Sequence, residues 1–215
     1  MQTTLEEIQD FKGKYPKQLW YLFFSEMWER FCFYGMRGML TVFMVSQLMM
    51  KEDVANLQYG ATQAFVYAFT FIGGLFADKI LGFRKSLFWG GLLMITGSCI
   101  LAFGLGKAQT VELNSFWFFL GLSFTIVGTG FFKPNISTMV GQLYPANDRR
   151  IDSAFTIFYM GINLGAFFSP LVCGSMDFKW GFLAAGVGML IGLVAFVLGQ
   201  KKYLVSEEGK SIGLP

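Results

Sequence analysis

Five long stretches of this chain contain no charged residue. They cover residues 54–77, 86–106, 115–132, 153–176 and 181–200. A helix that crosses the hydrocarbon core of a bilayer needs ~20 apolar residues, so each stretch has the length of a membrane span. A sixth stretch, at about 19–50, is also long and apolar but carries several charged residues. The pattern predicts an all-α integral membrane protein with six transmembrane helices.

The composition of the chain supports this class and argues against a soluble domain. Charged residues make up 14% of the chain and hydrophobic residues 54%, whereas soluble domains carry ~25% charged residues. The net charge of +3 is too small to indicate a nucleic-acid partner, and the lipid bilayer is the expected surrounding. Small-residue pairs such as Gly161–Gly165 and Gly188–Gly192 fit close contacts between membrane helices.

The Lys and Arg residues are distributed unequally between the two sides of the predicted spans. One side receives only Lys51, Lys107 and Lys179. The other side receives Lys12, Lys14, Lys17, Lys79, Arg84, Lys85, Arg149, Arg150, Lys201, Lys202 and Lys210. Because cytoplasmic loops carry the excess of Lys and Arg, both termini are expected in the cytoplasm. The predicted organisation is a cytoplasmic tail at 1–18, a six-helix bundle at 19–200, and a second cytoplasmic tail or the start of a linker at 201–215.

Residues suited to catalysis or metal binding are scarce. The chain has no histidine, and Cys32, Cys99 and Cys173 lie far apart within apolar stretches, where they are interpreted as small packing residues. An intramembrane enzyme would need a nucleophile with a base, or a metal motif such as HExxH, and the sequence contains neither. We predict that the protein is not an enzyme and has no catalytic residue, no metal site and no cofactor.

The charged residues of the first predicted span share one side of a helix. Its E-M-W-E-R segment holds Glu26, Glu29 and Arg30. Positions i and i+4 of a helix are neighbours, so Arg30 is expected to touch Glu26. The same side continues to Phe33 or Tyr34 and then to Arg37, ~10 Å further along the axis. An ionisable group in hydrocarbon costs ~3 kcal/mol or more, so this side is predicted to line a polar cavity.

Lys133 adds a fifth ionisable residue to the predicted spans. It precedes Pro134, which bends a helix and frees a backbone carbonyl. Three cations then face two carboxylates, and the surplus positive charge predicts an anionic ligand. A carboxylate beside Arg stays ionised, whereas one sequestered in an apolar site favours its protonated form, so a Glu–Glu–Arg cluster that changes partners could carry a proton. The alternative interpretation is a buried ion-pair network that only holds helices together.

The link between the second and third spans has two interpretations. Asp78 ends one predicted helix, and Arg84 and Lys85 precede the next. The segment also contains three glycines that permit close helix approach and a sharp turn: Gly73, Gly74 and Gly82. It is either a charged turn that sets topology, or a cytoplasmic latch (Asp78, Arg84 and Lys85) that is made in one transporter state and broken in another.

Four motifs, taken together and in order, resemble the signatures of proton-dependent oligopeptide transporters in the major facilitator superfamily. E-M-W-E-R-F-C-F-Y-G at 26–35 resembles the ExxER and FYG signature of that family. Three further motifs resemble signatures on later helices: G-G-L-F-A-D-K-I-L-G at 73–82, G-T-G-F-F-K-P-N-I-S at 128–137 and F-Y-M-G-I-N-L-G at 158–165. The resemblance runs from about residue 19 to residue 200.

The resemblance implies the N-terminal six-helix bundle of a symporter that imports di- and tripeptides with protons. The proton-coupling cluster would be Glu26, Glu29 and Arg30. The peptide carboxylate would be held by Arg37 and Lys133, and the other peptide contacts would be Tyr34, Tyr67 and Asn163. The absence of histidine resembles the bacterial branch of the family, so the expected location is the inner (cytoplasmic) membrane.

The sequence departs from the family pattern in two respects. Thr70 stands where many relatives have a proline, and the chain ends after the first of two six-helix halves. A fragment, a split gene product and a half that dimerises are all open, and the expected partner is a C-terminal six-helix half or a second copy. Two alternative functions remain: a transporter half for another small anionic solute such as nitrate, and a truncated membrane subunit without transport of its own.

Overall fold

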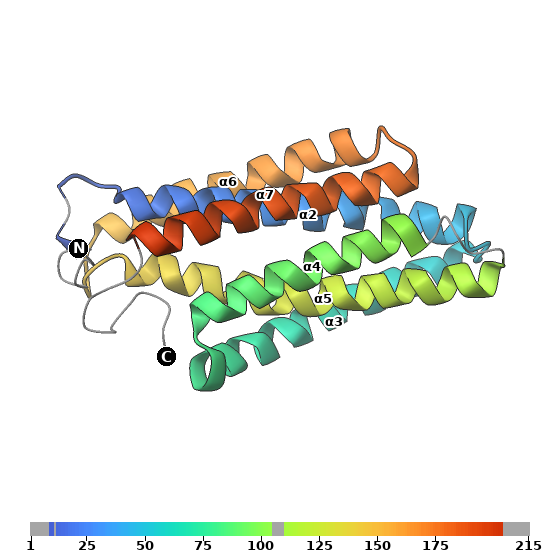
Figure 1. Ribbon diagram of the computed structural model, residues 1–215, viewed down its shortest axis with the longest axis horizontal. Helices are drawn as coiled ribbons and strands as arrows, with labels where there is room; N and C mark the ends of the chain where they lie inside the picture. The colour runs from blue at the N-terminus through green and yellow to red at the C-terminus, as the bar shows by residue number, and fades with distance from the viewer. Residues whose placement is uncertain (1–8, 11, 105–109, 204–215) are drawn as a thin grey trace.

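The computed structural model describes residues 9–10, 12–104 and 110–203, with side chains up to residue 200. Within these ranges the chain forms long helices and no strand. In chain order they are α2 (Lys17–Ser46), α3 (Glu52–Phe76) with its π-helical extension η1 (Ala77–Leu81), α4 (Phe83–Gly104), α5 (Val111–Gln142), α6 (Arg150–Cys173) and α7 (Phe178–Tyr203) (Figure 1). The tails predicted at 1–18 and 201–215 fall largely outside the described residues.

Five of these helices are long and apolar enough to cross a membrane: α3 together with η1, α4, α5, α6 and α7. They correspond to the five charge-free stretches of the sequence. The remaining long helix, α2, has 30 residues and runs alongside the others, and its role as a sixth span stays a prediction. α2 begins and α7 ends at the same end of the bundle (Figure 1), as an even number of passes requires.

The helices form two groups that share one core. α2 packs against α6 and α7, α5 packs against α3 and α4, and α4 also contacts α7. Aromatic rings join three helices near one end of the bundle. The ring of Phe43 on α2 stacks on Phe118 of α5 at a centroid distance of 5.0 Å and meets the edge of Phe182 on α7 at 5.7 Å. Such aromatic pairs stabilise a core by more than the burial of their apolar surface alone.

Glycines bring α4 and α5 into backbone contact. A Cβ atom added at Gly90 would lie 2.8 Å from the carbonyl oxygen of Gly128, and one added at Gly97 would lie 2.6 Å from that of Gly121. The two glycine pairs noted in the sequence contact α2: Gly161 and Gly165 from α6, and Gly188 and Gly192 from α7. The prediction of close helix contacts at these pairs is confirmed.

Gly128→Ala should destabilise the bundle, whereas Gly60→Ala should not. The new Cβ atom at Gly128 would lie 2.6 Å from the backbone oxygen of Gly90, and at Gly60 no atom lies within 4 Å. Overpacking of this kind costs ~1–3 kcal/mol. Thermal unfolding of the purified protein in detergent measures the difference. Equal melting temperatures for the two variants would contradict the α4–α5 contact.

The link between α3 and α4 is more helical than predicted. Asp78 does not end a helix, because the chain continues as η1 to Leu81 and turns at Gly82, whose φ is 77°. Glycine adopts such a positive φ at little cost. Arg84 and Lys85 belong to the first turn of α4. Thr70, the departure on α3, donates its hydroxyl to the carbonyl of Val66 at 2.8 Å, and the helix continues through it.

The segment that precedes α2 is bound to the link between α5 and α6. The Tyr144 hydroxyl donates to the carbonyl of Lys14 at 2.8 Å, and Arg150 donates to that of Gly13 at 2.8 Å. Arg150 also donates to the carboxylate of Asp148 at 2.6 Å and holds the pKa of that carboxyl below its usual value. Residues 13–14, predicted as tail, are therefore part of the folded bundle.

Candidate functional site

Three charged side chains of α2 form a buried cluster, Glu26, Glu29 and Arg30. The Nε of Arg30 lies 3.3 Å from Oε1 of Glu26, so the contact predicted from the i, i+4 spacing is confirmed. Arg30 also donates through Nε and Nη2 to the two oxygens of Glu29, the latter at 2.5 Å. This bidentate bond between adjacent residues was not predicted, and charge-assisted pairs of this kind are among the stronger hydrogen bonds.

The cluster leaves one carboxylate oxygen unsatisfied. All three side chains are at most 3% exposed, and Oε2 of Glu26 has no hydrogen-bond partner in the described part of the chain. The ring of Phe33 covers the guanidinium of Arg30 at 5.1 Å. Arg30 therefore holds both carboxylates of the cluster in a space closed by apolar groups.

Arg37 lies two turns further along α2, between two tyrosines. Its guanidinium carbon is 5.8 Å from the ring centre of Tyr34 and 5.5 Å from that of Tyr59 on α3. Its Nε donates to the Tyr59 hydroxyl at 2.5 Å. The two rings thus fix the guanidinium at the junction of α2 and α3.

Lys133 reaches the same region from α5. Its Nζ lies 5.4 Å from the ring centre of Tyr67 on α3. Pro134 follows inside the helix and leaves the carbonyl of Gly130 without its helical N–H partner. That carbonyl faces α3 at Gly73, where the missing side chain lets the two helices approach.

Two cations of the site lack a carboxylate partner. Arg37 and Lys133 are half-buried, and neither forms an ion pair within the described ranges. Both instead lie beside tyrosine rings. Three cations against two carboxylates leave one surplus positive charge, as the sequence indicated.

The predicted site residues differ from the observed ones at two positions, Tyr59 and Asn163. Tyr59 was missed, although it lies two turns before Tyr67 on the same side of α3, and that spacing was the available signal. Asn163 was predicted to contact the peptide. It is exposed on α6 and makes no hydrogen bond with a described residue, so the structure does not connect it to the cations.

The residues of the predicted latch lie at the end of the bundle where α2 begins. Arg84 donates through Nε and Nη2 to the side-chain oxygen of Gln200 on α7, each at 3.3 Å. Asp78 and Lys85 are exposed, and Asp78 forms no ion pair among the described residues. The link therefore contacts α7 through Arg84.

Comparisons with known proteins agree with this architecture. Residues 84–213 match the family model PTR2, the POT family. The chain is 40% identical over 199 residues to the uncharacterized transporter YclF of Bacillus subtilis, covering 88% of this chain and 39% of that protein. It is 39% identical over 191 residues to the peptide transporter YePEPT of Yersinia enterocolitica, covering 85% and 36%.

A solved structure shares the fold. The crystal structure of a peptide transporter POT in complex with sulfate superposes with a TM-score of 0.84 at 38% identity, covering 99% of this chain and 44% of the other. The chain thus spans about two fifths of the length of the relatives it matches. The family match, the apolar helices and the shared fold show that this chain is a multi-pass membrane protein that belongs to the POT family of transporters, which are not enzymes.

Proposed function

We propose that this chain is the N-terminal half of a proton-coupled symporter that imports di- and tripeptides across the inner (cytoplasmic) membrane. The observation that carries the proposal is the pair Arg37 and Lys133, two half-buried cations without a carboxylate partner in the described structure. On α2, Arg37 follows a buried carboxylate cluster by two turns. A zwitterionic peptide brings the carboxylate that this pair lacks.

The peptide carboxylate is proposed to bind between Arg37 and Lys133. The rings of Tyr34, Tyr59 and Tyr67 hold the two cations from α2 and α3. They thereby reduce the side-chain freedom lost when a substrate binds. The exposed ring of Tyr67 also offers a flat apolar surface to a peptide side chain. Asn163 is proposed as a further peptide contact, from α6.

The proton is proposed to bind at the cluster of Glu26, Glu29 and Arg30. One guanidinium against two carboxylates leaves the cluster with a net charge of −1, and a buried charge that is not compensated costs several kcal/mol. A proton on either Glu neutralises it. Movement of Arg30, or entry of water when the site opens, changes this balance, so proton binding and conformation are coupled.

A second six-helix bundle is proposed to complete the site. Only four residues of α3 are buried, namely Ala55, Thr62, Val66 and Gly73. The exposed side of α3 includes Tyr67 beside Lys133. Alternating access in this superfamily needs two bundles that rock around a site between them. The partner is a C-terminal half or a second copy of this chain, and Asp78, Arg84 and Lys85 are proposed to act as a latch between states.

Uptake of a radiolabelled dipeptide tests the assignment in the transporter that contains this chain. We expect uptake to rise when the outside is made acidic. Unlabelled dipeptide should compete, and nitrate at the same concentration should not, because it lacks the amino group and length of a peptide. Competition by nitrate together with no effect of dipeptides would assign the site to a small inorganic anion.

A further inference from the structure

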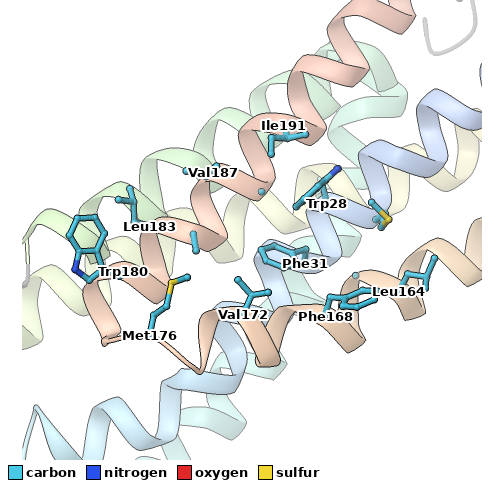
Figure 2. A pocket seen from close by; sticks show the side chains of 14 residues that line it. Trp28, Phe31, Leu164, Phe168, Val172, Met176, Trp180, Leu183, Val187 and Ile191 are labelled. Carbon is cyan, nitrogen blue, oxygen red and sulfur yellow. The ribbon is translucent and has the colours of Figure 1, made fainter.

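A large apolar groove lies between α6 and α7, on the opposite side of α2 from the charged site. Its volume is about 930 Å³, at the upper end of the ~300–1,000 Å³ range of small-molecule sites. Figure 2 shows Trp180 and Met176 at one end and Trp28 and Ile191 at the other, with Phe31 on the floor. None of the lining residues is charged.

The groove exists because α6 and α7 each pack on α2 and touch each other little. Two glycines let α6 and α7 approach α2 closely at the base of the groove. A Cβ atom at Gly188 would lie 2.6 Å from the ring of Phe31, and one at Gly165 would lie 3.0 Å from Cβ of Arg30. The side chains that remain at the rim, such as Val187 and Phe168, are about half exposed.

Lys179 does not line the groove, but it lies next to Trp180, which does. The Nζ of Lys179 lies 5.6 Å from the ring centre of Trp180 and 5.8 Å from that of Phe103 on α4. Asp177 is close in sequence but forms no ion pair with Lys179 in the described structure. Tryptophan and lysine together are typical of the membrane–water interface, where phospholipid headgroups lie.

We propose that the groove binds one acyl chain of an anionic membrane phospholipid, whose phosphate lies at Lys179. The groove belongs to two helices of membrane-spanning length, so hydrocarbon surrounds it. Its uncharged walls suit an acyl chain, and the positive charge of Lys179 is opposite to that of the phosphate. A polar protein segment would find no charged side chain on these walls, so such a segment is not the occupant we propose.

Fluorescence quenching by brominated phosphatidylglycerol tests the proposal in the full protein. One variant retains Trp28 as its only tryptophan, in the groove, and a reference variant retains Trp89, which is 52% exposed on α4. Both are reconstituted in phosphatidylcholine with a small fraction of the brominated lipid. We expect Trp28 to be quenched at least threefold more strongly than Trp89 at low lipid fraction, with saturation. Equal quenching of the two would overturn the proposal.

Substitutions at the groove separate bound lipid from bulk lipid. Val187→Phe fills the groove and should reduce Trp28 quenching to the level of Trp89, whereas Leu190→Phe, on the same helix but outside the groove, should leave it unchanged. Lys179→Gln should lower the preference for phosphatidylglycerol over phosphatidylcholine about fivefold, because one lysine contributes ~1 kcal/mol at an anionic surface. If Trp28 is shielded and Val187→Phe instead disrupts association of two bundles, a protein helix occupies the groove and the lipid proposal is wrong.

Discussion

Replacing Lys133 or Arg37 by Ala should lower the affinity for a dipeptide with a free C-terminal carboxylate by at least ~30-fold. Truncating one partner of a buried, hydrogen-bonded charge pair costs 2 kcal/mol or more. Each cation is half-buried and forms no ion pair in the described structure, so each alanine variant removes one of the two counter-charges proposed for the ligand. Competition binding, measured in the transporter that contains this chain, gives the change in affinity.

Two controls sharpen this result. A dipeptide amide, which has no C-terminal carboxylate, should lose little further affinity in either variant, because the missing interaction is with the carboxylate. Lys51→Ala removes an exposed lysine at the start of α3 and should have no effect. Tyr59→Phe should give an intermediate loss, since it frees the Arg37 guanidinium without removing its charge. Near-normal affinity in both alanine variants would show that the carboxylate binds elsewhere.

Replacing Glu29 by Gln should abolish proton-driven accumulation of peptide while sparing exchange of peptide across the membrane. The amide keeps the size of the side chain and still accepts a hydrogen bond from Arg30, but it cannot take up and release a proton. One pH unit corresponds to 1.36 kcal/mol, which supports ~10-fold accumulation with one proton. The variant should therefore equilibrate its substrate to a ratio of ~1 in proteoliposomes.

Glu112→Gln is the matched control, because Glu112 lies exposed in the first turn of α5, far along the helix from Lys133. It should accumulate peptide normally. If Glu29→Gln also accumulates peptide under a pH gradient, the coupled proton binds outside this cluster. Loss of both accumulation and exchange would instead indicate that the Arg30–Glu29 bond is needed to form the binding site itself.

The membrane helices could be predicted because a helix spans the bilayer only if its apolar stretch is long enough, and the length of that stretch is a local property of the sequence. The charge-free stretch at 115–132 was nevertheless shorter than α5, which continues to Gln142 through Lys133 and Pro134. The interior proline is tolerated because the carbonyl it frees faces Gly73 on another helix. A contact between residues so distant in sequence leaves no local pattern.

In the site, too, contacts within one helix could be predicted and contacts between helices could not. The contact between Arg30 and Glu26 follows from the pitch of a single helix and was predictable. The spacing of Tyr59 and Tyr67 on α3 could have suggested that Tyr59 belongs to the site. Its hydrogen bond with Arg37 depends on how α2 and α3 meet, which the sequence of neither helix specifies. The groove between α6 and α7 depends on both helices packing on α2, so composition alone could not reveal it either.

The bond between the segment before α2 and the α5–α6 link has a consequence for biosynthesis. Lys14 and Tyr144 are 130 residues apart, and Gly13 and Arg150 are 137 residues apart. At a ribosomal rate of ~5–20 residues per second, on the order of ten seconds separate the emergence of these partners. The segment before α2 can therefore dock only after α5 and the start of α6 have been synthesised, and its docking marks that stage of assembly.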